Sequence, residues 1–123
     1  RVLFRSLTQI KNSKTIIVKG SLKRERDLTY CKDAAQAIHK ALSLENTTQE
    51  IINIGTGKKT TVYEIIKNII DIFGYSINNY DIIEKASLAG DPFSSICDIS
   101  LAKKKLKFFP KYSFSSGLND MLK

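Results

Sequence analysis

The sequence predicts an α/β fold, because short apolar strands alternate along the chain with helices that carry one apolar face. The β-branched run at residues 15–18 ends at Gly20 and indicates a strand. Residues 61–74 predict the clearest helix, opened by the capping pair Thr61 and Glu64 and ended by Gly74. Its apolar side is formed by residues at helical spacing: Val62, Ile65, Ile66, Ile69 and Phe73.

The segment between this strand and this helix predicts one more helix and one more strand. Residues 21–26 are charged and predict a loop, followed by an extended stretch to residue 31. Asp33, with Gln36 three residues on, is expected to cap a helix that runs to about residue 44. The expected buried face of that helix is Ala34, Ile38, Ala41 and Leu42. A turn at residues 46–49 then leads to a strand at residues 50–54.

The last part of the chain predicts a weaker strand at residues 81–84 and two short helices. The first helix is lysine-rich, and the residues that define it are Asp98 or Ser100 as its cap, Leu101 and Leu106 as its apolar side, and Pro110 as its end. The second begins after Ser113, and its apolar stripe comprises Phe114, Leu118, Met121 and Leu122.

Composition limits the classes of function. The chain has 123 residues, the size of one domain, and no run approaches the ~18 apolar residues of a membrane span. Twenty Lys+Arg against 12 Asp+Glu give a net charge of +8, which makes nucleic acid a possible partner. The basic residues are dispersed except at residues 103–107, so a solvated helix face is favoured. Cys31 and Cys97 lie far apart without metal-ligand spacing, and we expect a reducing cytoplasm.

The first six residues, Arg1 to Ser6, are similar to a translated sequencing adapter. We therefore expect residues 1–6 to be a non-native scar and residues 7–123 to be the native part. We also expect the N-terminal part of the gene product to be missing from this sequence.

Three local patterns imitate known catalytic chemistry. Tyr63 and Lys67 have the Tyr-x-x-x-Lys spacing of short-chain dehydrogenases, but they lie on an amphipathic helix where such pairs are common. The segment at residues 55–60 lacks the third glycine of a dinucleotide loop and is interpreted as a tight turn. His39 is the single histidine and fits a helix surface. The carboxylates are spread out, and we expect no metal site.

Three longer motifs occur in a fixed order. The first, at residues 17–35, contains Gly20, the pair Arg26-Asp27 and Tyr30. The second runs from Ile52-Asn53-Ile54-Gly55-Thr56-Gly57 to Thr61-Val62-Tyr63-Glu64. The third runs from Gly90-Asp91 through Asp98-Ile99-Ser100-Leu101-Ala102 to Pro110 and Gly117-Leu118. Together they resemble the C-terminal part of the NAD-dependent epimerase/dehydratase family, the extended short-chain dehydrogenase/reductases that include UDP-glucose 4-epimerase.

This resemblance implies a fold and a function. The fold would be the C-terminal fragment of an extended Rossmann-type nucleotide-sugar enzyme, with mixed short strands and helices. The parent protein would be a nucleotide-sugar epimerase or dehydratase that uses bound NAD(P) for transient oxidation of the sugar, and it would be a cytoplasmic homodimer. The chain itself would bind the nucleotide-diphosphate sugar, whereas NAD and the catalytic Tyr-x-x-x-Lys would belong to the missing upstream part. The fragment alone is expected to be inactive.

The resemblance also assigns residues. Arg26 matches the arginine that contacts the diphosphate, a role that suits a permanently charged guanidinium. Ile17, Val18 and Lys19 match the strand whose backbone passes the nucleotide base, and Asp91 matches the acid that accepts hydrogen bonds from ribose hydroxyls. Leu88 stands where UDP-sugar epimerases usually have a second arginine, and Lys107 stands where the family usually has glycine. No catalytic, cofactor-binding or metal residue is assigned.

Two other interpretations stay open. The chain could be a small basic nucleic-acid-binding domain that uses residues 103–107, or a non-catalytic relative that binds sugar nucleotides. Salt dependence separates the first from a sugar-nucleotide site, because binding to a phosphate backbone weakens steeply with added salt.

Overall fold

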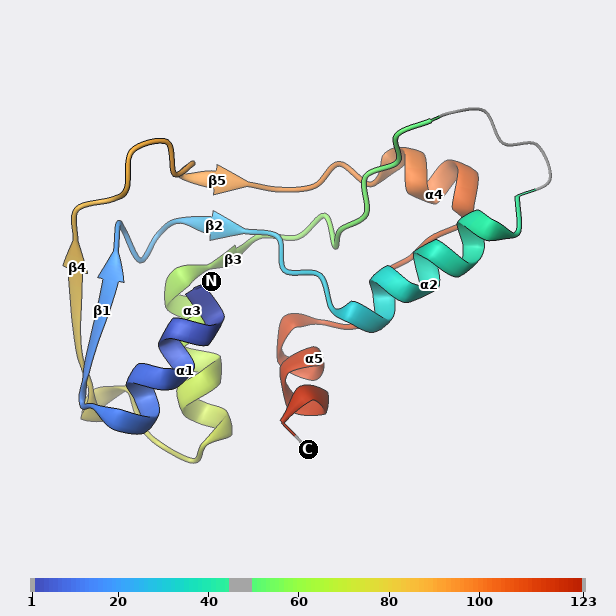
Figure 1. Ribbon diagram of the computed structural model, residues 1–123. Coiled ribbons are helices and arrows are strands. Elements are labelled where there is room, and N and C mark those ends of the chain that lie inside the picture. Colours follow the sequence, from blue (N-terminus) through green and yellow to red (C-terminus); the bar gives the residue numbers. More distant parts are fainter. Residues whose placement is uncertain (1, 45–49, 123) are drawn as a thin grey trace. The chain divides into compact units, whose positions relative to one another are not determined.

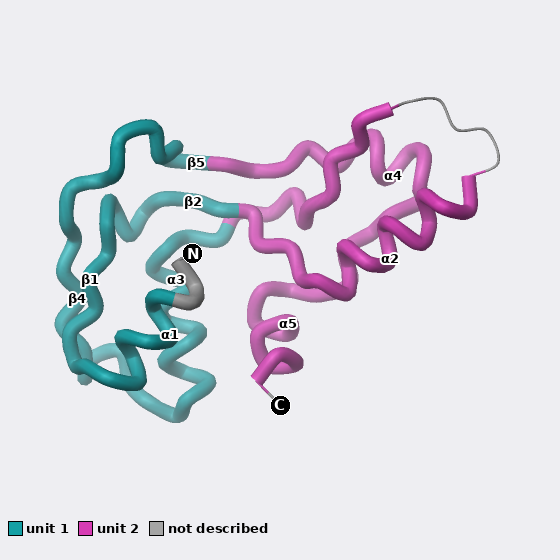
Figure 2. The backbone as a smooth tube through the Cα atoms, viewed as in Figure 1, with its two compact units in different colours: residues 1–26, 60–94 teal, residues 27–59, 95–123 magenta. Residues whose placement is uncertain are grey.

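The computed structural model describes residues 2–44 and 50–122, with side chains from Arg5 onward. The chain divides into two compact units, coloured separately in Figure 2: residues 1–26 with 60–94, and residues 27–59 with 95–123. Each unit is therefore built from two separate stretches of the chain.

The first unit contains two α-helices, one 3-10 helix and most of the strands (Figure 1). In chain order its elements are α1 (Val2–Asn12), β1 (Thr15–Lys19), β2 (Glu25–Arg26), β3 (Thr60–Thr61), α3 (Val62–Ile72), η1 (Ile77–Asn79) and β4 (Asp81–Lys85). Strands β1 and β4 pair in parallel, with Ile17 opposite Ile83. A second sheet has the order β3-β2-β5, where β5 (Ser94–Ser95) lies at the boundary of the units. The predicted strands at residues 15–18 and 81–84 are confirmed.

The core of this unit lies between the β1–β4 pair and the two helices (Figure 1). Ile16 and Val18 face inward from β1, and Ile10 joins them from α1. The buried side of α3 consists of Val62, Ile65, Ile66, Ile69 and Ile70. On the other face of the strand pair, Ile17 and Ile83 keep 40% and 41% of their surface exposed.

The predicted cap of α3 is confirmed in both of its hydrogen bonds. The Glu64 amide donates to Thr61 Oγ1 at 3.1 Å, and the Thr61 amide donates to Glu64 Oε2 at 2.7 Å. Gly74 follows the helix with φ of +74°, a conformation that glycine adopts without strain. Helix α1 was not predicted, because it has no acidic residue in its first turn to mark its start.

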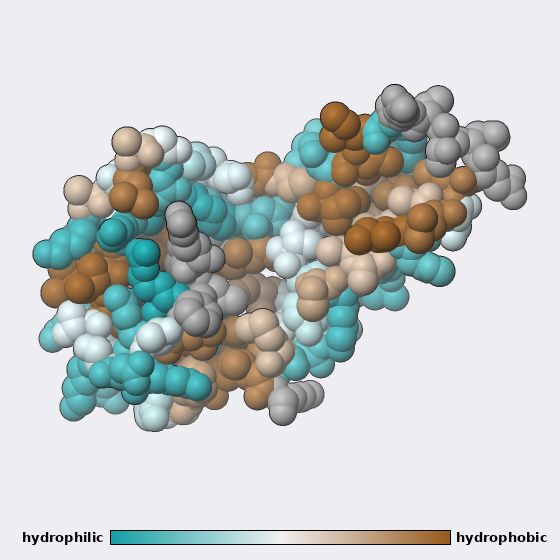
Figure 3. Space-filling view, viewed as in Figure 1, coloured by the Kyte–Doolittle hydropathy of each residue, from teal (hydrophilic) through white to brown (hydrophobic). Residues whose placement is uncertain are grey.

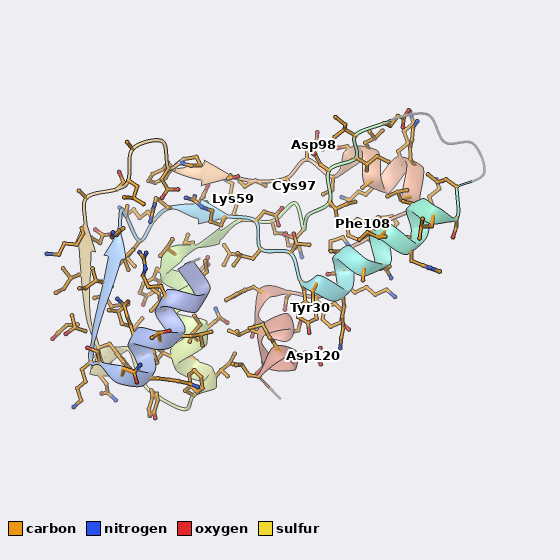
Figure 4. The ribbon with its side chains drawn as sticks, in the orientation of Figure 1. Tyr30, Lys59, Cys97, Asp98, Phe108 and Asp120 are labelled. Carbon is orange, nitrogen blue, oxygen red and sulfur yellow. The ribbon has the colours of Figure 1, made fainter. Side chains whose placement is uncertain are left out.

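The second unit contains α2 (Cys31–Leu42), α4 (Ser100–Leu106) and α5 (Phe114–Met121). Its buried cluster is formed by Ala37, Ile99, Ala102, Leu106 and Phe108, with Ile52 and Ile54 packed against it. Phe108 is fully buried and is labelled in Figure 4. The predicted helices of this unit are therefore present, but several details differ.

The predicted cap of α2 is wrong, and its predicted buried face is correct only in part, because Ala41 packs against the buried cluster. The helix begins at Cys31, so Asp33 lies inside the first turn, where its buried carboxylate accepts the backbone amides of Lys111 at 2.9 Å and Tyr112 at 3.1 Å. Asp33 and Ala37, one turn apart, therefore define the buried side. Ile38 and Leu42, predicted as buried, are exposed, Leu42 at 81%. Figure 3 shows apolar surface over this part of the second unit.

The secondary structure predicted for two segments differs from the observed one. Residues 50–54 form no strand, because no described segment pairs with their backbone, and Ile51 is 92% exposed. Residues 21–26 are not entirely loop, since Glu25–Arg26 pairs antiparallel with Thr60–Thr61. The turn predicted at residues 46–49 lies outside the described residues.

The two C-terminal helices follow the prediction with smaller changes. Asp98 Oδ1 accepts the Ser100 amide at 2.9 Å and so supports the start of α4, but Ala102 replaces Leu101 on its buried side. The helix ends at Leu106, where Lys107 adopts a left-handed conformation, and not at Pro110. Ser113 caps α5 as predicted, with its Oγ accepting the Ser116 amide at 3.1 Å. Leu118 is the buried member of the predicted stripe.

None of the helices in the described part of the chain has the length and the apolar character needed to cross a bilayer.

Candidate functional site

The first unit brings together two of the predicted site residues, Arg26 and Asp91. Arg26 lies in β2, the middle strand of the three-stranded sheet, so backbone pairing on both sides fixes its position. Its Nη2 contacts Asp91 Oδ1 at 2.7 Å, and its Nη1 donates to the carbonyl oxygen of Glu25 at 2.7 Å. A longer bond of 3.3 Å joins Nη1 to the Phe93 carbonyl. The guanidinium is thus oriented by one carboxylate and two carbonyl groups.

A second arginine, Arg24, contacts the same carboxylate and was missed by the sequence analysis. Its Nη1 pairs with Asp91 Oδ2, so each carboxylate oxygen binds one guanidinium. Nη2 donates to the Lys19 carbonyl, and Nε donates to the Ser21 carbonyl at 3.3 Å. Arg24 is only 5% exposed. Charged residues are rarely buried to this extent unless they are paired, and Arg24 is paired with Asp91.

Gly20 makes room for this buried guanidinium. Its φ is +91°, and a Cβ at this position would lie 2.6 Å from Arg24 Cζ. The glycine that ends β1 is therefore needed both for its backbone conformation and for the close approach of Arg24.

The remaining predicted residues lie on β1, next to these arginines. Val18 points into the core, whereas Ile17 and Lys19 lie on the opposite face. Lys19 is opposite Lys85 in the parallel ladder, and the Gly20 amide donates to the Lys85 carbonyl at 2.7 Å. Leu88 is exposed and starts the turn that ends at Asp91, whose amide donates to the Leu88 carbonyl at 3.2 Å.

A pocket of about 380 Å³ opens beside Asp91. Its lining consists of Gly20, Ser21, Arg24, Glu84, Lys85, Ser87, Asp91 and Phe93. Arg26 is not part of this lining, but it contacts two lining residues, the Asp91 carboxylate and the Phe93 carbonyl oxygen. The site is thus a surface pocket with Arg24 in its lining and Arg26 bound to the same carboxylate.

The glycine-containing segment at residues 55–57 is occupied by a carboxylate of its own chain. Asp27 accepts the amides of Thr56 at 2.9 Å and Gly57 at 2.8 Å, together with the Thr56 hydroxyl at 2.5 Å. The Cys97 amide adds a longer bond of 3.3 Å. Because these amides already bind an anion, this turn does not fit the phosphates of a dinucleotide.

The residues of the other local patterns that imitate catalytic chemistry have ordinary structural contacts. Lys67 Nζ lies 2.5 Å from Asp71 Oδ2, and this hydrogen bond raises the pKa of Lys67. Tyr63 and His39 are exposed on their helices. In the lysine cluster, Lys105 pairs with Glu50. Across residues 2–44 and 50–122, no group of three or more His, Cys, Asp or Glu side chains is placed to hold a metal ion.

A polar cluster in the second unit joins α5 to the start of α2 (Figure 4). The Tyr30 hydroxyl donates to Asp120 Oδ2 at 2.7 Å, and Lys32 Nζ contacts the same oxygen at 2.6 Å. The hydrogen bond to Asp120 raises the pKa of Tyr30 well above its usual value. The Tyr112 ring packs against the Tyr30 ring in a tilted arrangement, with centroids 4.8 Å apart and an interplanar angle of 51°. Within the family motif, Tyr30 thus has a structural role in this chain.

Comparisons with known proteins agree on one family. A profile of the NAD dependent epimerase/dehydratase family matches residues 1–55. An uncharacterized UDP-glucose epimerase of Bacillus subtilis is 28% identical over 116 residues, which is 94% of this chain and 36% of that protein. A UDP-glucuronate 4-epimerase of Thermodesulfobacterium geofontis is 33% identical over 94% of this chain and 35% of its own length.

The solved structures lead to the same result. The UDP-glucuronic acid 4-epimerase of Bacillus cereus, in complex with UDP-glucuronic acid and NAD, superposes with a TM-score of 0.86 at 28% identity. That match covers 96% of this chain and 37% of the other. The chain thus spans about a third of the length of the curated relatives that it matches. In sequence and in its α/β fold, the chain is thus similar to members of the NAD-dependent epimerase/dehydratase family.

Proposed function

We propose that this chain forms the nucleotide-sugar-binding part of an NAD-dependent nucleotide-sugar epimerase or dehydratase. One observation carries the proposal: Arg26 and Asp91, 65 residues apart in sequence, meet at 2.7 Å. Both were assigned to the substrate from the family motifs alone. The surrounding fold supports the assignment, because the end of β1 lies next to the same pair through Lys19 and Arg24.

The roles proposed for these residues follow from their chemistry. Arg26 would bind the diphosphate, since a guanidinium has five N–H donors and its described protein contacts use only three. Asp91 would accept hydrogen bonds from the ribose hydroxyls. The backbone of Ile17, Val18 and Lys19 would pass the nucleotide base, in line with the resemblance.

NAD would be bound by another part of the protein. The structural relatives from Bacillus cereus were crystallised with NAD, but the turn at residues 55–57 has its amides occupied by Asp27. When bound, NAD would supply the transient oxidation of the sugar. The chain described here would position the substrate, with residues 7–123 as its native part, in a cytoplasmic and dimeric enzyme.

The experiment compares three variants of the full-length protein by their affinity for UDP. Arg26→Ala should weaken binding by about 2–3 kcal/mol, or roughly 30- to 150-fold, as expected for a lost charge-assisted hydrogen bond. Arg26→Lys should restore part of the loss, because an ammonium lacks the guanidinium fork. Lys104→Ala, on the exposed side of α4, should leave the affinity within about twofold.

The nucleic-acid interpretation predicts the opposite order. The lysines at residues 103–107 would then dominate binding, and affinity would fall steeply with added salt. Equal and small effects of Arg26→Ala and Lys104→Ala on UDP binding would contradict the proposed function.

A further inference from the structure

We propose that Arg24 is a positioning residue of this site: it neutralises Asp91, so that the cluster with Arg26 keeps a net positive charge for an incoming anion. The inference rests on the proposed function and adds to it a residue that the family motifs do not assign. Its basis is the way in which two arginines share one carboxylate.

The charges around the shared carboxylate do not balance. Arg24 and Arg26 contribute two positive charges, and Asp91 contributes one negative charge, so the three side chains retain a net charge of +1. Of the other charged residues in the pocket lining, Lys85 and Glu84 offset each other. Without Arg24, Arg26 and Asp91 would form a neutral pair, and the attraction for a diphosphate would fall.

Arg24 is built into the fold, whereas Arg26 is partly open. The Arg24 side chain is 6% exposed and joins the segment at the end of β1, through the Lys19 and Ser21 carbonyls, to the Asp91 carboxylate. The Arg26 side chain is 19% exposed. Both guanidinium groups bind the Asp91 carboxylate, but Arg24 is enclosed by the fold and Arg26 keeps more of its surface open.

Gly20 supports this assignment independently. Any side chain at position 20 would collide with the Arg24 guanidinium, since a Cβ would lie within 2.9 Å of Cζ, Nε and Nη1. The backbone at the end of β1 is therefore shaped around the charged group of Arg24. A surface arginine in contact with water would not need a glycine beside its guanidinium group.

The test measures the affinity of the full-length protein for inorganic pyrophosphate, which carries the diphosphate charge without the ribose that Asp91 would also contact. Arg24→Gln should weaken pyrophosphate binding about tenfold. The matched control is Lys23→Gln, which removes a neighbouring exposed charge outside the network and should change the affinity less than twofold.

The second substitution separates charge compensation from a purely structural role. Asp91→Asn should tighten pyrophosphate binding several-fold, because both arginines are then released. The double variant, Arg24→Gln with Asp91→Asn, should return to within about twofold of the wild type. A purely structural role for Arg24 predicts no such rescue, so a double variant as weak as Arg24→Gln alone would overturn the inference.

Failure of the proposed function gives a different pattern. In that case the wild-type protein would not bind UDP, or Arg26→Ala would leave UDP binding unchanged. If Arg24→Gln does not fold, Asp91→Asn alone decides: tighter pyrophosphate binding supports the inference, and weaker binding overturns it.

Discussion

Arg24 and Arg26 stand two positions apart on the same short stretch, yet the fold uses them differently. Arg26 was assigned from the sequence because it belongs to the Arg-Asp pair of a recognisable motif. Arg24 was not assigned, because it lies in the charged run from Lys23 to Arg26. Nothing in the sequence of this run distinguishes a buried arginine from a solvated one. Its role depends on Asp91, which reaches it only through the fold.

At the same scale, the two cysteines should differ in reactivity. Burial raises the pKa of the Cys97 thiol, and the Asp27 carboxylate adds to the shift, so the reactive thiolate is disfavoured. Cys31 is exposed. At pH 8, a maleimide reagent should therefore label Cys31 at least tenfold faster than Cys97, as measured by peptide mass spectrometry over time.

The Asp27→Asn variant provides the control for this explanation. Removing the carboxylate charge should speed the labelling of Cys97 and leave the rate at Cys31 unchanged. Equal labelling rates for the two cysteines in the wild-type protein would show that Cys97 is more accessible than the structure indicates.

At the scale of elements, patterns with a local cause were predicted well. The capping box of α3 and the serine cap of α5 depend on residues three positions apart, and both are present. Ile38 and Leu42 were wrongly assigned to the buried face of α2, because the buried Asp33 is satisfied by amides 78 and 79 residues away. Residues 50–54 have the composition of a strand, but strand formation needs a paired neighbour, which composition does not reveal.

The end of α4 offers a test of local strain. Lys107 adopts φ of 49° at the position where the family usually has glycine. A left-handed conformation costs a non-glycine residue roughly 1 kcal/mol, so Lys107→Gly should stabilise the protein by about 0.5–1 kcal/mol. Urea unfolding monitored by circular dichroism measures the change.

The matched control replaces Lys104, inside the same helix, by glycine. There the substitution should destabilise the protein by about 1 kcal/mol, because glycine is unfavourable in a helix interior. A loss of stability in Lys107→Gly as well would indicate that the lysine side chain contributes more than its backbone conformation costs.

At the scale of the whole molecule, the chain forms two compact units and corresponds to about a third of its relatives' length. The resemblance to the family could be found in the sequence because three motifs occur in order, although each is weak alone. The proposed substrate residues, Ile17, Val18, Lys19, Arg26 and Asp91, all belong to the first unit. The second unit contributes the Tyr30–Asp120 cluster and the Asp27-anchored turn, which have structural roles.

The central claim is that Arg26 and its neighbours bind the diphosphate of a nucleotide sugar. A crystal structure of the full-length protein with UDP tests it most directly. We expect a phosphate oxygen within about 3 Å of an Arg26 nitrogen. Arg24 should still be paired with Asp91, and the base should lie beside β1. UDP bound at a site remote from Arg26 and β1 would contradict it.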